Sequence, residues 1–168
     1  MSKIAAEGEI SKGLLFHYFL NKKELYMYLW NNAMEQTRKA TSEYRVTETT
    51  DFFEMIHRAL QAKCSLMGTS PYLYQFSVKA YYEQEPEIRA VIQESFQQVS
   101  ENSENVIWQL VGTSKLRNDI DMKLMYQEIL WVSDGYLRQM MQDNVLEPAQ
   151  MERDFSRMIE QWKKVYLK

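Results

Sequence analysis

Apolar residues recur at spacings of three and four along most of this chain, which is the pattern of helices that bury one face. After Asp51, for example, one helical face carries Phe52, Ile56, Ala59, Leu60, Lys63 and Met67. The chain has only five glycines and three prolines, and helix-forming residues such as Leu, Met, Glu, Gln, Lys and Ala are plentiful. We therefore predict an all-α fold.

Local signals place the ends of these helices. Asn21 and Asp51 can each cap a helix, because each has a glutamate three residues later, at Glu24 and Glu54. All three prolines stand where a first helical turn tolerates them, and Gly-Thr-Ser runs at 68–70 and 112–114 end two helices. The pattern predicts two short helices at the start of the chain, followed by helices near 21–44, 51–67, 71–83, 86–111, 121–142 and 148–166.

The first residues carry the most specific motif. Positions 4–19 read IAAEGEISKGLLFHYF and continue as NKKEL at 21–25. This order indicates a short helix, a tight turn and a second short helix that Ser11 caps, the arrangement that places a recognition helix in a DNA groove. The segment resembles the helix-turn-helix of the tetracycline-repressor (TetR) family of bacterial regulators.

The resemblance implies a partial helix-turn-helix module at 1–25, followed by a TetR-like helical ligand-binding and dimerisation domain at 26–168. It rests on sequence only in the first module, and on helix count and length beyond it. The helix count is one short of the family's, and the first helix of the DNA-binding domain is the one we expect to be absent. A truncated regulator and a form that has lost DNA affinity both fit this expectation.

The resemblance also assigns DNA contacts. Lys12, Leu14 and His17 match positions that face base edges, and Tyr18 and Lys22 match positions that hold phosphates. The free amides of the turn after Ser11 offer a further anion site, and Gly13 lets the backbone approach closely. The predicted DNA-binding residues are therefore Ser11, Lys12, Gly13, Leu14, His17, Tyr18 and Lys22. Taken singly, each polar residue among them is more often an ordinary surface residue.

The motif departs from the family pattern in its turn. The family places glycine just before the apolar turn residue, because that backbone favours a left-handed conformation. Here Gly8 comes one position early and Glu9 occupies the usual site, which also brings a negative charge near the expected phosphate. Phe16 replaces the commoner tyrosine. We expect a small core of Ile4, Ile10, Leu15, Phe19 and Leu25, exposed where the first helix is lacking.

Beyond residue 26 the chain is rich in aromatic and methionine side chains, which most often form a helical core. The alternative that the resemblance favours is a cavity for a small lipophilic ligand between the helices. The predicted ligand-binding residues are Phe76, Tyr81, Trp108, Tyr126 and Trp131. A flat or cationic ligand would find charge at Glu83, Glu128 or Asp134.

The last two helices carry apolar stripes, which the resemblance assigns to a four-helix interface between the subunits of a homodimer. The predicted interface residues are Ile129, Val132, Tyr136, Met140, Phe155, Ile159 and Trp162. The alternative is packing within one chain, and we expect it to account for about half of each stripe.

Charge and composition add little to the prediction of function that the motif gives. The net charge of the chain is −3, with +2 in residues 1–45 and −5 in the rest, so the basic excess lies with the motif. The single cysteine, Cys64, fits a reducing cytoplasm, and no segment indicates membrane contact. We find no motif for catalysis, a metal or a cofactor and predict none of the three. The predicted function is a ligand-responsive repressor that binds operator DNA as a dimer; the alternative is a dimeric binding module for small molecules or proteins, without DNA affinity.

Overall fold

The computed structural model describes residues 1–143 and 147–168, and these are all-helical apart from their connections. The predicted all-α fold is confirmed. Within the described ranges there are eight helices: α1 (Ser2–Glu7), α2 (Lys12–Tyr18), α3 (Lys22–Glu43), α4 (Phe52–Thr69), α5 (Pro71–Tyr81), α6 (Pro86–Leu110), α7 (Met122–Gln142) and α8 (Pro148–Tyr166). No helix in this part of the chain is long and apolar enough to cross a membrane.

The predicted helix starts are confirmed by their caps. Ser11, Asn21 and Asp51 each accept a hydrogen bond from the backbone N–H three residues later, at 3.0, 2.9 and 3.1 Å. The prolines begin α5, α6 and α8, where a missing N–H leaves no hydrogen bond unmade. The signals for these helix starts are therefore local in the sequence.

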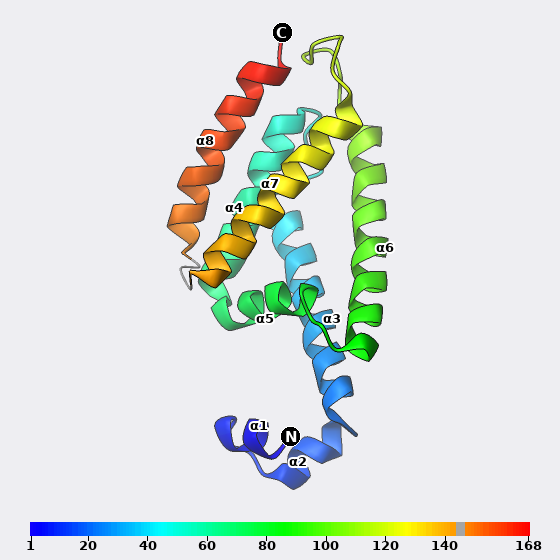
Figure 1. Ribbon diagram of the computed structural model, residues 1–168, viewed down its shortest axis with the longest axis vertical. Helices are drawn as coiled ribbons and strands as arrows, with labels where there is room; N and C mark the ends of the chain where they lie inside the picture. The colour runs from blue at the N-terminus through cyan, green and yellow to red at the C-terminus, as the bar shows by residue number, and fades with distance from the viewer. Residues whose placement is uncertain (144–146) are drawn as a thin grey trace.

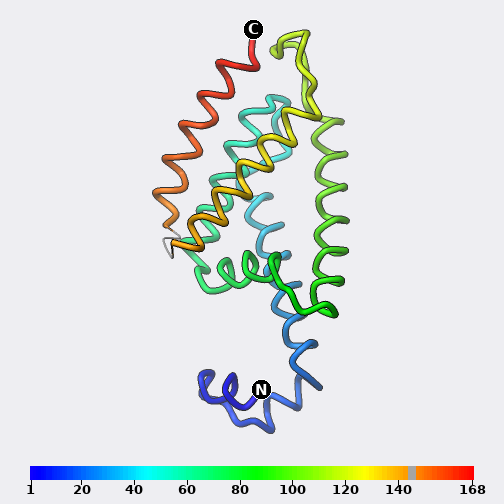
Figure 2. The backbone as a smooth tube through the Cα atoms, in the orientation of Figure 1, coloured from blue at the N-terminus to red at the C-terminus, as the bar shows by residue number. Residues whose placement is uncertain are grey.

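The helices form an elongated molecule (Figure 1). Helices α1 and α2 lie at one end with the N-terminus, and α3 leads from them into the larger part of the chain. Helix α4 packs against both α3 and α8, and α5 crosses between α4 and α6. The tube in Figure 2 shows the C-terminus at the end opposite α1 and α2.

Three apolar clusters hold these parts together. A small one joins α1, α2 and the start of α3 through Ala5, Leu15 and Leu25. A second, the junction cluster, joins α3, α5 and α6 through the fully buried residues Trp30, Ala80 and Ile92. The main core lies between α4, α7 and α8; its largest fully buried side chains are Phe53, Met125, Met151 and Ile159.

The predicted core of the first module is correct only in part. Leu15 and Leu25 are buried and Phe19 packs against them. Ile4 and Ile10, however, remain 39% and 40% exposed. The six-residue helix α1 turns only one narrow face toward α2, and Ala5 occupies that face instead of Ile4. The predicted domain boundary at 25/26 falls inside α3, which continues through it without a break.

Candidate DNA-binding face and ligand cavity

Helix α2 presents nearly its whole surface to solvent. Leu15 is its one buried residue, at 5% exposure, and it anchors the helix on the small cluster. All seven predicted DNA-binding residues are exposed: Ser11, Lys12, Gly13, Leu14, His17, Tyr18 and Lys22. The fold thus brings six of them together on one short helix and its cap, and sets Lys22 at the first position of α3. Their role in DNA binding stays a prediction.

The two lysines of this face are available for an external anion. The Lys12 ammonium lies 5.8 Å from the centre of the Phe16 ring, one helical turn away. Within the described ranges, neither Lys12 nor Lys22 forms a salt bridge. The neighbouring Lys23, by contrast, contacts Glu87 at 3.4 Å. A phosphate at this face would therefore not have to break a salt bridge of either lysine.

The turn between α1 and α2 has the left-handed residue that the family pattern implies, and Glu9 supplies it. Its φ is 53°, whereas Gly8 has an ordinary φ of −86°. The N–H of Ile10 donates to the carbonyl of Ala5 at 3.0 Å, and the N–H of Glu9 to that of Ala6 at 3.2 Å. These two bonds form a Schellman motif in which glycine is the preferred residue at the position of Glu9.

Replacing Glu9 by glycine is expected to stabilise this module by about 1 kcal/mol, because glycine adopts a left-handed backbone without a steric penalty. Hydrogen exchange of the α1 and α2 amides measures the effect, since it reports local opening. Glu9→Gln is the matched control, because it removes the charge but keeps the backbone strain. Equal protection in the Gly and Gln variants would contradict the strain argument.

A cavity of about 550 Å³ lies between α3, α4, α6, α7 and α8. Its wall is mainly aliphatic, with two aromatic rings from Tyr126 and Phe155 and a few polar side chains. The volume falls within the range of about 300–1,000 Å³ that small-molecule sites occupy. The lining includes Arg38, Thr41 and Ser42 of α3, Met55, Ile56, Ala59, Leu60 and Lys63 of α4, Asn102, Ser103, Val106 and Ile107 of α6, Ile129, Leu130, Ser133 and Leu137 of α7, and Met151 of α8.

Of the five residues predicted to bind a ligand, only Tyr126 lines this cavity. The ring of Trp108 contacts the ring of Tyr126 edge to face, with 5.6 Å between the two ring centres. Phe76 packs at the junction cluster, Tyr81 packs 4.6 Å from the Phe96 ring, and Trp131 points outward with 63% exposure. The prediction missed the aliphatic wall because aromatic content alone does not show which helix faces enclose a space.

The acidic residues expected to supply charge are occupied elsewhere. Glu83 accepts a hydrogen bond from the Tyr26 hydroxyl at 3.2 Å, and burial together with this carboxylate raises the pKa of Tyr26 to about 12. Asp134 and Glu128 likewise accept hydrogen bonds from tyrosine hydroxyls. None of the three carboxylates is among the lining residues, and the charged groups there are Arg38 and Lys63.

The predicted dimer interface needs a correction. Four of its residues are buried in the chain's own core and offer no open surface to a partner: Ile129, Met140, Phe155 and Ile159. Tyr136 is also engaged internally, because its hydroxyl donates to Asp154 at 2.8 Å. Val132 remains exposed and Trp162 is half-buried. Each predicted stripe thus combines residues of a buried face with residues of a more exposed face, because α7 and α8 both contribute side chains to the main core beside α4.

Cys64 is the remaining group with reactive chemistry. Its side chain is buried in the main core, and burial raises the pKa of the thiol to about 11. A buried thiol with a raised pKa forms little of the nucleophilic thiolate at neutral pH. Cys64 therefore acts as a small apolar core residue.

The arrangement of helices has a known counterpart. A TetR family transcriptional regulator from Chloroflexus aurantiacus J-10-FL, solved by crystallography, aligns with 100% of this chain and 83% of its own chain, at a TM-score of 0.66 and 20% identity. No family profile matches the sequence. No curated protein matches it either. The helices of this chain thus have the fold of a TetR family transcriptional regulator.

Proposed function

We propose that this chain is a ligand-responsive transcriptional regulator, a repressor, that binds operator DNA as a homodimer. One observation carries the proposal: α3 connects the two candidate sites. Its first residue, Lys22, stands at the exposed helix-turn-helix face, and its later turns line the cavity with Arg38, Thr41 and Ser42. An occupant of the cavity therefore contacts the helix that carries the DNA-binding face.

Dimerisation supplies the geometry for DNA recognition. Two recognition helices that read successive major grooves must be spaced about one DNA turn apart, roughly 34–36 Å. A ligand that binds one arrangement of the subunits more tightly shifts the population toward it, and an arrangement with the wrong spacing releases the operator. We place the subunit contact on the exposed apolar stripe of α7, formed by Leu124, Trp131 and Val132.

Selection from a random-sequence DNA pool tests the proposal. The full chain is expected to enrich a palindromic sequence and to bind it with an affinity that falls steeply between about 50 and 200 mM salt, as released counterions require. Sedimentation measured in parallel reports the dimer. A chain that dimerises but enriches no sequence and binds no duplex at low salt would instead be a binding module without DNA affinity.

A further inference from the structure

The cavity wall contains one positively charged residue of α4, on a helix face that is otherwise apolar. Helix α4 turns one face toward the cavity with Met55, Ile56, Ala59, Leu60 and Lys63, at the spacing of successive turns. The first four close the wall with aliphatic surface. Lys63 continues the same face and brings an ammonium group to it.

Lys63 has no internal counter-charge in the described part of the chain, where it forms neither a salt bridge nor a side-chain hydrogen bond. Surrounding protein atoms desolvate the ammonium, and this lowers the pKa of Lys63 below its ordinary value. The residue is nevertheless exposed, so its ammonium group is accessible to an external partner while the residue lines the cavity.

Four of the other polar residues of the lining are already engaged in side-chain hydrogen bonds. The guanidinium of Arg38 donates to both carboxylate oxygens of Glu35, at 2.8 and 2.9 Å. The hydroxyls of Thr41, Ser103 and Ser133 donate to carbonyls of their own helices, at 2.7–2.8 Å. The described lining contains no aspartate or glutamate. Lys63 is thus the charged donor that remains for an occupant.

We propose that the cavity takes an apolar molecule with a single carboxylate, and that Lys63 pairs with this carboxylate. The inference rests on the proposed role of the cavity as the ligand site and names the class of its ligand. The sequence allowed a flat or a cationic ligand, and this proposal assigns the opposite charge to the ligand. A neutral ligand would leave the ammonium group without a counter-charge, and a cationic ligand would be repelled by it.

Calorimetric titration of the chain without DNA tests the inference. The ligands are decanoate, decanol and decylamine, at concentrations too low for them to aggregate. The three probes share one alkyl chain and differ only in the head group. We expect decanoate to bind at least about tenfold more tightly than decanol, the factor typical of a hydrogen bond to a charged group, and decylamine to bind most weakly.

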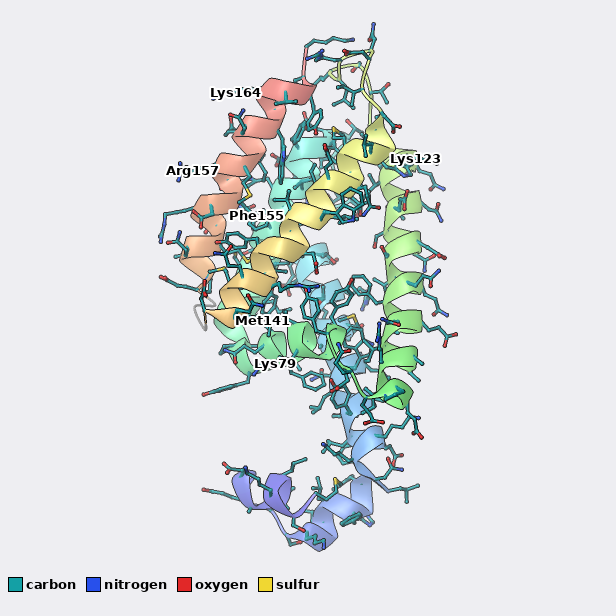
Figure 3. All side chains as sticks on the ribbon, in the orientation of Figure 1. Lys79, Lys123, Met141, Phe155, Arg157 and Lys164 are labelled. Carbon is teal, nitrogen blue, oxygen red and sulfur yellow. The ribbon has the colours of Figure 1, made fainter. Side chains whose placement is uncertain are left out.

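Three variants assign the preference for decanoate to Lys63 and the binding to the cavity. Lys63→Met keeps the length of the side chain and is expected to abolish the preference for decanoate while decanol still binds. Lys123→Met is the matched control, because Lys123 is exposed on α7 outside the cavity lining, as its label in Figure 3 indicates. It is expected to leave all three affinities unchanged. Ala59→Trp, which places a bulky ring in the cavity, is expected to weaken the binding of every probe.

Equal affinities for decanoate and decanol, or a preference that survives Lys63→Met, would overturn this inference and leave the cavity as a ligand site of other specificity. Absence of binding by all three probes would overturn it and also count against ligand sensing. Because the titration uses no DNA, a failure of operator binding leaves its result unaffected.

Discussion

Charge reversal at Lys12 and Lys22 together is expected to weaken operator binding by at least about 100-fold, because a dimer would present four repulsive groups to the DNA where four attractive ones stood. Both side chains are exposed and neither forms a salt bridge in the described ranges. Each also lies in the first turn of its helix, where glutamate interacts favourably with the helix dipole. The melting temperature should therefore stay the same or rise slightly.

Fluorescence anisotropy over a range of salt concentrations measures this loss. For every phosphate contact removed, the slope of log K against log salt should become shallower by about 0.9. The control reverses Lys123 and Lys164, which changes the net charge equally but lies far from α1 and α2 (Figure 3). A similar loss of affinity in the control would mean that total charge, and not the helix-turn-helix face, governs binding.

Truncation of Trp30 to alanine is expected to lower the free energy of unfolding by about 3–5 kcal/mol, the usual effect of deleting a buried aromatic side chain. Trp30 is 1% exposed at the centre of the junction cluster, between Ala80 of α5 and Ile92 of α6. Its indole N–H also donates to the Ser95 hydroxyl at 3.0 Å. Urea denaturation followed by circular dichroism gives the change in free energy.

The conservative variant Trp30→Phe separates packing from hydrogen bonding. It keeps a six-membered aromatic ring but removes the N–H and part of the indole volume, so it should cost about 1–2 kcal/mol, less than alanine. Equal destabilisation by phenylalanine and alanine would assign the effect to the bond with Ser95 and would contradict the packing argument. Loss of this cluster also frees α3 from α5 and α6, so the alanine variant should respond less to any cavity ligand.

The helix boundaries were predictable because their determinants are local. Ser11, Asn21 and Asp51 cap helices through bonds that span three residues, and a proline fixes its own backbone angle wherever it stands. The left-handed turn could likewise be expected at Glu9 from the family pattern. In each case the signal and its structural effect lie within one turn of each other.

The cavity was not predictable in this way, because its wall combines faces of five helices that are distant in sequence. Four of the five aromatic residues chosen from composition pack against other aromatic rings, as Tyr81 does against Phe96. One local signal was nevertheless present: Lys63 interrupts an otherwise apolar face of its helix. The sequence alone does not show whether a lysine at such a position faces solvent, an acidic residue or a cavity.

The unbroken course of α3 has a mechanical consequence. At a rise of about 1.5 Å per residue, the 19 steps from Lys22 to Thr41 make a rod of about 28 Å. If that rod pivots by about 5° at its cavity end, its far end swings by about 2.5 Å. In the regulator proposed above, a ligand that displaces the cavity end of α3 by a small distance would therefore move each recognition helix by a larger one, although the ligand itself does not reach the DNA.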